Sequence, residues 1–196
     1  EMTTGRQNAD RGRAYFTKIL NQCSSVMQKI VTCPKPVIAE IDGVATAAGC
    51  QLVASCDLAV ASETAQFCTP GVHIGLFCST PMVALSRNLA NKHAMEMLLT
   101  GDMVSASRAA EMGLVNQVVP SADLCAGSMA LAGKIATKSS FTVATGKRAF
   151  YQQKEMDLEA AYNYASKTMV DNMLARDAKE GIAAFIEKRV PDWRDE

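Results

Sequence analysis

Residues 36–57 read PVIAEIDGVATAAGCQLVASCD, and this stretch decides the fold. Its β-branched run at 37–41 predicts a short buried strand, and Asp42-Gly43 predicts a turn. Small residues then lead into a predicted helix over 47–55. This order places a backbone that is nearly free of side chains at a helix N-terminus, where unpaired N–H groups and the helix dipole favour negative charge. The stretch therefore predicts a site that can stabilise a carbonyl oxygen as it gains charge during a reaction.

Around this stretch short strands alternate with helices, and the chain then becomes helical to its end. An amphipathic helix over 10–31 stops before Cys33-Pro34, because proline lacks the N–H donor and restricts the residue before it. The further expected elements are strands at 57–61, 65–68 and 115–119, a turn at 69–71, a helix with Ser79 as its N-cap, and helices over 92–100 and 105–113 that end at Gly101 and Gly113. From residue 121 the helical pattern breaks near 139–141, 153–157 and 176–177. The order predicts an α/β layer with a helical C-terminal extension.

Composition excludes several classes of function. The chain has 196 residues, 48% of them apolar, and 20 basic residues against 20 acidic ones, so no net field attracts nucleic acid or an anionic membrane. Its seven cysteines form no Cys-x-x-Cys pair and it has only two histidines, which disfavours a disulfide framework and a metal site. Reduced thiols are typical of the bacterial cytoplasm or the mitochondrial matrix. No apolar run is long enough to span a membrane.

Four blocks of the sequence, in this order, resemble the crotonase superfamily, which is the enoyl-CoA hydratase/isomerase family. They are KPVIAEIDGVATAAGCQLVASCDLAVAS (35–62), AQFCTPGVHIGL (65–76), AMEMLLTGDMVSASRAAEMGLVNQVVP (94–120) and EGIAAFIEKR (180–189). The resemblance implies a spiral of β-β-α turns over residues 1–135, whose first turns lie before Glu1. It implies a helical segment over 136–196 that mediates trimer formation, often as a dimer of trimers. The implied ligand is an acyl thioester of coenzyme A, with no separate cofactor.

Members of this family hold the thioester oxygen between two backbone N–H groups, and the resemblance assigns one of them to Ala48. The other implied substrate-binding positions are Ala45, Thr46, Ala47, Gly49, Pro70 and Ile74. The second donor lies upstream in family members, and the opening Glu1-Met2 resembles the end of that loop. Because the donor is main chain, side chains need only be small enough for the substrate to approach, which agrees with the residues present.

The two glutamates that hydratases of this family use to add water are replaced. The resemblance places one of them at Gln51, after Gly49-Cys50, and the other at Gly71, after Thr69-Pro70. A neutral amide can hydrogen-bond a water but does not exchange protons near neutral pH, and glycine has no functional group. General acid–base groups contribute roughly 10²–10⁴ in rate each, so ordinary hydration is expected to be weak or absent.

Other side chains near this site could act as a base, an acid or a nucleophile, and each has a simpler explanation. His73 would share a face with residue 71 if residues 71–73 were extended, and imidazole titrates near neutral pH. The simpler explanation is that His73 packs against or caps a loop. Ser79 lies nearest to a position where some isomerases and dehalogenases of the superfamily carry an acid, but an N-cap role explains it. Cys78, like Cys50, needs a base or a dipole to become a nucleophile and is otherwise a small apolar filler.

These observations leave three hypotheses of different classes. The first is an acyl-CoA-handling enzyme that polarises the thioester carbonyl through the Ala48 N–H. Slow hydration, isomerisation, thioester cleavage and decarboxylation remain open as its reaction. The second is an acyl-CoA-binding or regulatory oligomer that has lost turnover, which Gln51 and Gly71 favour. The third is a purely structural oligomer partner, which the retained small-residue run at 45–49 disfavours.

Overall fold

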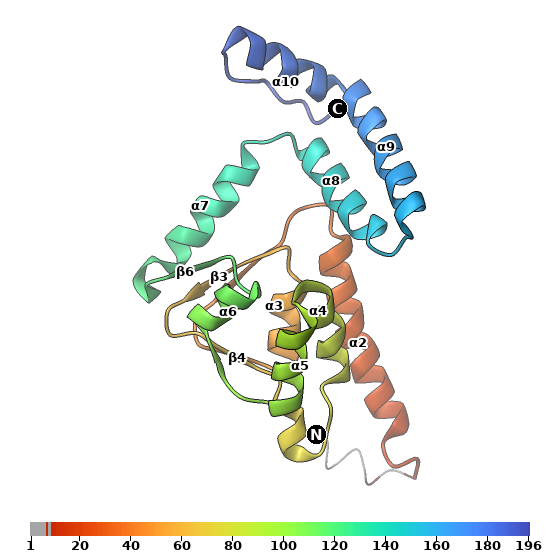
Figure 1. Ribbon diagram of the computed structural model, residues 1–196, viewed down its shortest axis with the longest axis vertical. Helices are drawn as coiled ribbons and strands as arrows, with labels where there is room; N and C mark the ends of the chain where they lie inside the picture. The colour runs from red at the N-terminus through yellow and green to blue at the C-terminus, as the bar shows by residue number, and fades with distance from the viewer. Residues whose placement is uncertain (1–6, 8) are drawn as a thin grey trace. The chain divides into compact units, whose positions relative to one another are not determined.

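The computed structural model describes residue 7 and residues 9–196 (Figure 1). The resemblance noted at Glu1-Met2 therefore lies outside the described residues. The chain forms two compact units. The first comprises residues 38–125 with the described residues up to 31, and the second comprises residues 32–37 with 126–196. In the described part of the chain, no helix combines the length and the apolar character that a membrane span requires.

The first unit contains two three-stranded sheets, and the first four strands of the chain alternate between them. One sheet has the order β1-β3-β6, with β1 at Ile38–Ile41, β3 at Leu58–Ser62 and β6 at Gln117–Val119, all parallel. The other has the order β2-β4-β5, with β2 at Val44–Thr46, β4 at Gln66–Cys68 and β5 at Val104–Ser105. In that sheet β2 and β4 are parallel, whereas β4 and β5 are antiparallel.

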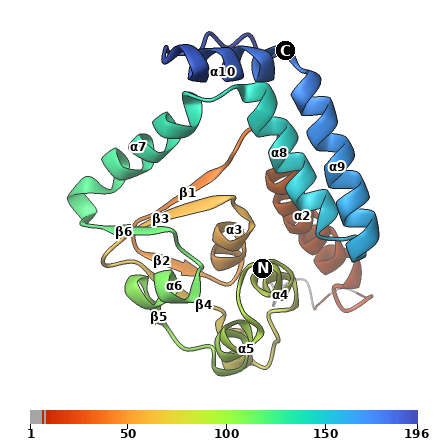
Figure 2. The same ribbon diagram turned by 45° about the horizontal axis from the view of Figure 1, so that its top comes forward.

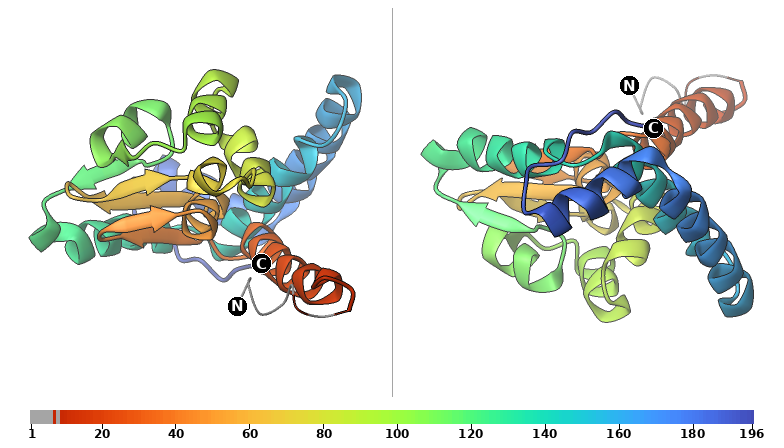
Figure 3. Two further views of the ribbon diagram at one scale, coloured as in Figure 1. Left: turned by 90° about the horizontal axis from the view of Figure 1, so that it is seen from below. Right: turned by 90° about the horizontal axis from the view of Figure 1, so that it is seen from above.

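Consecutive strands pass from one sheet to the other and a helix follows, which makes each repeat a β-β-α turn. Strands β1 and β2 lead into α3 (Ala48–Ser55), and β3 and β4 lead through a 3-10 turn, η1 (Pro70–Ile74), into α4 (Ser79–Asn88) and α5 (Asn91–Thr100). Equivalent strands of the two turns pair in parallel, with Ile38 opposite Leu58 and Val44 opposite Gln66. Figure 2 shows α3 beginning beside β2, and Figure 3 shows the short strands running alongside one another. The predicted α/β spiral is confirmed.

The buried core of this unit lies between the strands and the helices that follow them. Its fully buried side chains include Cys50, Val60, Phe67, Leu85, Met97 and Leu98. Helices α5 and α6 (Ala106–Met112) end at Gly101 and Gly113, with φ values of 69° and 86°. Both values are in the left-handed region that favours glycine, so both predicted helix ends are confirmed. The amphipathic helix α2 extends over Arg13–Thr32 and stops before the predicted Cys33-Pro34 boundary.

The second unit is helical, as the sequence predicts. It contains α7 (Leu124–Ala136), of which the first residues belong to the other unit, and then α8 (Ser140–Gln153), α9 (Leu158–Leu174) and α10 (Arg176–Glu187). The breaks fall at 137–139, 154–157 and Ala175, within one or two residues of the predicted positions. The functional boundary predicted after residue 135 lies within α7 and stays a prediction.

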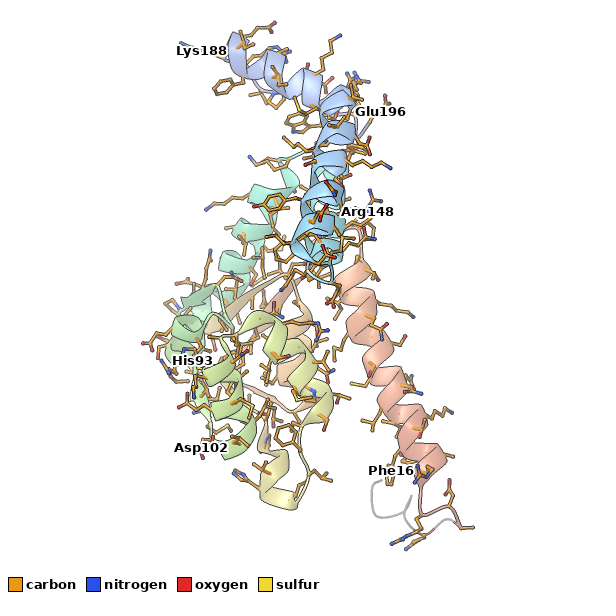
Figure 4. The ribbon with its side chains drawn as sticks, turned by 45° about the vertical axis from the view of Figure 1, so that its right-hand side comes forward. Phe16, His93, Asp102, Arg148, Lys188 and Glu196 are labelled. Atoms are coloured by element: carbon orange, nitrogen blue, oxygen red, sulfur yellow. The ribbon has the colours of Figure 1, made fainter. Side chains whose placement is uncertain are left out.

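The chain end folds back along α10 and is fixed there by buried and paired carboxylates. Figure 4 labels Lys188, just beyond α10, and Glu196 at the end of this tail. The buried Asp177 carboxylate accepts hydrogen bonds from the backbone N–H groups of Arg194 (2.9 Å) and Asp195 (3.0 Å). Glu180 accepts two bonds from the Arg189 guanidinium, at 2.6 and 3.0 Å. We call Asp177, Glu180, Arg189 and residues 192–195 the tail clamp.

The structure corrects two details of the sequence analysis. Strands β2 and β5 are not predicted, because three and two residues are too few to show a periodicity. Ser79 is not an N-cap, since α4 begins at Ser79 itself and Cys78 occupies the cap position. The Ser79 hydroxyl instead donates to the carbonyl of Phe77, at 3.3 Å.

Candidate functional site

The start of α3 exposes a backbone donor. Ala47 connects β2 to α3, and its N–H donates to the carbonyl of Cys68 in the neighbouring strand β4, at 3.0 Å. Its carbonyl accepts from Gln51 N–H at 2.9 Å, which closes the first turn of the helix. Within the described residues no hydrogen bond uses the Ala48 N–H, and Ala48 is exposed. A donor oriented along a helix axis and open to solvent can receive a developing negative charge.

Ala47 holds this donor in place with an unusual backbone conformation. Its φ is 47° and its ψ is −108°, a combination that residues with a Cβ rarely adopt. Strain of this kind costs of order 1–3 kcal/mol and persists only where the surrounding structure enforces it. Here the bond to Cys68 and the helix that follows enforce it, so the orientation of the Ala47–Ala48 peptide is fixed by the fold.

The residues beside Ala48 are small or are held away from its N–H. Ala45 is buried in β2, and a Cβ added to Gly49 would lie 4.0 Å from the Ala45 side chain. The exposed Thr46 accepts a hydrogen bond from the Cys68 thiol at 3.3 Å. The positions next to the donor in the sequence therefore carry short side chains. We call residues 45–51 together with 70–79 the α3 site.

Gln51 lies one helical turn after Ala48, and three residues of separation place both on the same face of α3. Its side chain is only 4% exposed. The amide oxygen faces the Cys23 thiol of α2, with Sγ 3.8 Å from Oε1. A thiol donates and the amide oxygen accepts, so this contact directs the amide nitrogen away from α2. Within the described residues no hydrogen bond uses Gln51 Nε2.

Gly71 is enclosed by the loop that follows it. Its carbonyl accepts from Leu76 N–H at 2.9 Å, so the chain turns back over it. A Cβ at this position would lie 2.8 Å from Cys78 Sγ and 2.8 Å from the Leu76 carbonyl oxygen. Both distances are shorter than any normal contact, and the carbonyl can move only with the backbone. The position assigned to the second glutamate therefore lacks the space for a side chain as well as lacking the acid.

The His73 side chain is bound to the end of α5 and does not share a face with residue 71. Residues 70–74 form a 3-10 turn, so the extended conformation that would place residues 71 and 73 on one face is wrong. His73 Nε2 lies 2.8 Å from the Thr100 carbonyl oxygen at the end of α5. A carbonyl only accepts, so Nε2 carries the proton and the side chain caps the helix end. Gly101 makes this possible, because a Cβ there would lie 3.0 Å from His73 Nε2.

The other candidate positions are dispersed around the same loop. Pro70 opens the 3-10 turn and is half-buried, whereas Ile74 is 71% exposed at its end. Ser79 is exposed and bonded only locally. Figure 4 shows His93 and Asp102 near the two ends of α5. His93 lies 3.9 Å from Glu96, three residues later on α5.

The thiols in this region differ in their exposure. Burial raises the pKa of the Cys50 thiol to about 12, and the nearby Cys68 and Cys78 thiols add to that effect. Cys50 is therefore a protonated core residue near neutral pH and has no role as a nucleophile. Cys78 is partly exposed and fills the space next to Gly71. In the described residues no cluster of three or more His, Cys, Asp or Glu side chains has the geometry to hold a metal ion.

Sequence reasoning missed two contacts that define this site. Cys23 and Gln51 are 28 residues apart, and Cys23 reads only as one more apolar position of the α2 stripe. Cys78 and Gly71 meet because η1 ends in a left-handed turn at Gly75, with φ 74°. That glycine is the one local signal in the sequence that could have indicated the reversal.

Comparison with known proteins adds a family model, curated relatives and solved structures. The model described as enoyl-CoA hydratase/isomerase matches residues 6–196. "Enoyl-CoA hydratase domain-containing protein 3, mitochondrial" of Mus musculus is 52% identical over 183 residues, which are 93% of this chain and 61% of that protein. Its Homo sapiens counterpart is 51% identical over 187 residues, which are 95% of this chain and 62% of that protein. The chain thus spans about three-fifths of these relatives.

Solved structures agree in fold. The crystal structure of human enoyl-CoA hydratase domain-containing protein 3 superposes with a TM-score of 0.90 at 51% identity, covering 96% of this chain and 74% of that one. A Mycobacterium smegmatis enoyl-CoA hydratase gives a TM-score of 0.91 at 51% identity, covering 95% and 72%. The sequence of residues 43–57 and 75–81 resembles domain-containing protein 3 and bacterial relatives, and this resemblance is confirmed at 51–52% identity over most of the chain.

Proposed function

This chain belongs to the enoyl-CoA hydratase/isomerase family, and from that premise we propose that it binds an acyl thioester of coenzyme A at the α3 site. The thioester oxygen would accept a hydrogen bond from the Ala48 N–H. The observation that carries this proposal is the unpaired, exposed N–H at a helix start, with short side chains around it. The second donor that the resemblance implies lies outside the described residues.

We further propose that ordinary hydration of enoyl thioesters is weak or absent. The two positions that the family resemblance assigns to hydratase glutamates carry a buried amide, Gln51, and an enclosed glycine, Gly71. The proposal gives His73 no acid–base role, because its ring is held at the end of α5 by the contact of Nε2 with the Thr100 carbonyl. An oxyanion donor without an acid–base pair still favours enolate or tetrahedral intermediates, so isomerisation, thioester cleavage and decarboxylation remain the candidate reactions.

The direct test is titration with butyryl-CoA carrying ¹³C at the thioester carbonyl, followed by calorimetry and by ¹³C NMR. Binding with a downfield shift of the carbonyl signal is expected, since a hydrogen bond to oxygen withdraws electron density from the carbon. Free coenzyme A, which has no thioester carbonyl, is the matched control ligand. Absence of butyryl-CoA binding, with the protein folded, would refute the proposal. Added metal chelator should leave binding unchanged, because the proposal includes no metal.

A second candidate function is acyl-CoA binding without turnover, as a sensor or regulatory oligomer. The enclosure of Gly71 favours it, because the loop has closed over the position that a catalytic side chain would occupy. Incubation of the protein with crotonyl-CoA, followed by product analysis, separates the two functions. Binding with no product over many protein equivalents supports the regulatory function, and any sustained turnover supports the enzyme.

We also propose that the protein forms homotrimers or dimers of trimers in the mitochondrial matrix. Large apolar side chains on the last two helices are exposed: Met169, Val170, Met173 and Leu174 on α9, and Ile182, Phe185 and Ile186 on α10. Exposed apolar surface of this extent is typical of subunit interfaces. The mitochondrial location is proposed because the names of the mouse and human relatives include the word mitochondrial. Light scattering during gel filtration tests the oligomer, and cell fractionation tests the location against a bacterial cytoplasm.

A further inference from the structure

Helix α10 buries little apolar surface of its own. Among residues 176–187 only Asp177 and Ala184 are buried, whereas Ile182, Phe185 and Ile186 are exposed. Burial of one alanine side chain contributes little hydrophobic free energy, so apolar packing does little to hold this helix in place. Elements with few buried apolar contacts open at low free-energy cost, and polar contacts then decide how often they open. The tail, residues 189–196, supplies such contacts.

The tail turns back at the end of α10 and lies along the helix. Lys188 has a φ of 55°, and the Arg189 N–H donates to the Ala184 carbonyl at 3.0 Å, which reverses the chain. Figure 1 shows the tail running back alongside α10. The Asp177 carboxylate, which accepts the tail N–H groups, also accepts the Ser139 hydroxyl before α8. The tail and the start of α10 therefore meet near the connection between α7 and α8.

The tail also binds this connection directly. The Trp193 ring lies against α10, since a Cβ at Gly181 would be 3.0 Å from it, and the ring N–H donates to the Thr137 carbonyl just after α7, at 2.8 Å. The Asp195 carboxylate accepts the N–H of Ser140, the first residue of α8, at 2.8 Å. One short segment is thus bound to α10 on one side and to residues 137–140 on the other.

We propose that the tail is a strap that controls the opening of α10. While it is bound to residues 137–140, α10 stays closed, and when those bonds break, α10 and the tail open together as one unit. They stay together because the carboxylates of Asp177 and Glu180 bind the tail through charge-assisted hydrogen bonds, which are the stronger kind. This inference concerns the second unit and does not depend on acyl-CoA binding.

Hydrogen exchange followed by mass spectrometry measures how often each segment opens. Trp193→Phe keeps an aromatic ring but removes the N–H donor, and Asp195→Ala removes the carboxylate. Combined in one variant, they remove the tail's two bonds to residues 137–140 and leave its bonds to α10 in place. We expect the α10 amides to exchange at least about tenfold faster than in wild type, because the lost hydrogen bonds no longer oppose opening. The amides of residues 192–195 should accelerate by the same factor.

Asp192→Ala is the matched control for this variant. It removes another carboxylate of the tail, which contacts Arg194 at 3.1 Å within the tail itself. Exchange in α10 should therefore match wild type. The amides of β3 report on the other unit and should keep their wild-type protection in every variant.

Gly181→Leu tests the strap from the side of α10. The added side chain meets the Trp193 ring, which already lies 3.0 Å from a Cβ at this position. Leucine favours the helix more than glycine does, so a helix held by its own propensity would open less often. We expect faster exchange in α10 instead, with a red shift of the fluorescence of Trp193, the one tryptophan of the chain. Gly146→Leu in α8 is the matched control, because nothing lies within 4 Å of its added Cβ.

The proposal is overturned if the folded double variant exchanges its α10 amides at the wild-type rate. It is also overturned if α10 accelerates while residues 192–195 do not, because helix and tail would then open separately. If the double variant loses protection in β3 and so is not folded, Gly181→Leu decides. Unchanged or slower exchange in its α10 would overturn the proposal, and faster exchange with the red shift would support it.

Discussion

The α3 site and the tail clamp differ in how their polar groups are paired. At the start of α3 a backbone N–H is left open among alanine, glycine and thiol side chains, and the acid positions carry Gln51 and Gly71. At the end of the chain two acidic residues, Asp177 and Glu180, have every partner supplied by backbone N–H groups, a hydroxyl or a guanidinium. These two carboxylates therefore act in structure, whereas the donor at the start of α3 is a neutral backbone group.

The two sites should differ in the substitutions that they tolerate. A site formed by backbone and short side chains fails when side chains are added, because it has no room. A clamp formed by paired charges fails when a partner is removed, because the remaining groups are left unsatisfied. The two sites should therefore respond to opposite kinds of substitution.

Adding a methyl group at Gly71 should have the largest effect. Gly71→Ala should lower the free energy of unfolding by about 2 kcal/mol, because the new Cβ overlaps Cys78 Sγ and the Leu76 carbonyl oxygen. Combining it with Cys78→Gly should recover part of this loss, since one of the two overlaps disappears. Urea denaturation measures both variants. Gly133→Ala in α7 is the matched control, because nothing lies within 4 Å of its added Cβ. Equal stability of Gly71→Ala and wild type would show that the loop is not closed.

Two serines give the second test. Ser139 caps α8, where its hydroxyl oxygen accepts from Thr142 N–H at 3.2 Å, and it also bonds the buried Asp177 carboxylate. Ser139→Ala should therefore cost about 1.5 kcal/mol. Ser79→Ala should cost far less, because Ser79 only contacts the nearby Phe77 carbonyl. Thermal unfolding of both variants compares them. If Ser79→Ala lost more stability than Ser139→Ala, Ser79 would act as an N-cap after all, contrary to the structure.

Local signals in the sequence account for most of the fold. Pro34, Gly101 and Gly113 each restrict the backbone locally, so the C-terminal ends of α2, α5 and α6 are predicted to within a residue or two. The start of α2 has no such signal, and it lies three residues after the predicted position. Strands β2 and β5 escape prediction because they owe their existence to pairing with β4. The same limit applies to the site. Ala48 at a helix start is readable, whereas the contact of Gln51 with Cys23 depends on two helices meeting.

The third test concerns the strained residue before the open donor. Ala47→Gly should raise the free energy of unfolding by about 1 kcal/mol, because glycine adopts a φ of 47° without the penalty of a Cβ. This gain is net of the greater freedom of glycine in the unfolded chain. Butyryl-CoA affinity should stay within a few-fold of wild type, since the Cys68 carbonyl still binds the residue 47 N–H. A loss of stability would mean that Ala47 is not strained.

Acid should weaken the tail clamp, and this is the smallest expected effect, because partly exposed ion pairs contribute little. The Arg189 guanidinium and the Asp192 N–H lower the pKa of Glu180 from 4.5 to about 2. Ser139 and the backbone N–H groups of Arg194 and Asp195 lower the pKa of Asp177 in the same way.

A carboxyl whose pKa is lower in the folded protein stabilises the fold above its unfolded pKa, and this contribution is lost as the pH falls. Wild type should therefore exceed Glu180→Gln in stability near pH 7, and the two should converge between pH 4.5 and about 2. Urea denaturation at several pH values measures the difference, with the exposed Glu63→Gln as control. If the stability difference between wild type and Glu180→Gln stayed constant down to pH 2, Glu180 would act through packing alone. Of Asp177 and Glu180, only Asp177 would then stabilise the tail clamp through its charge.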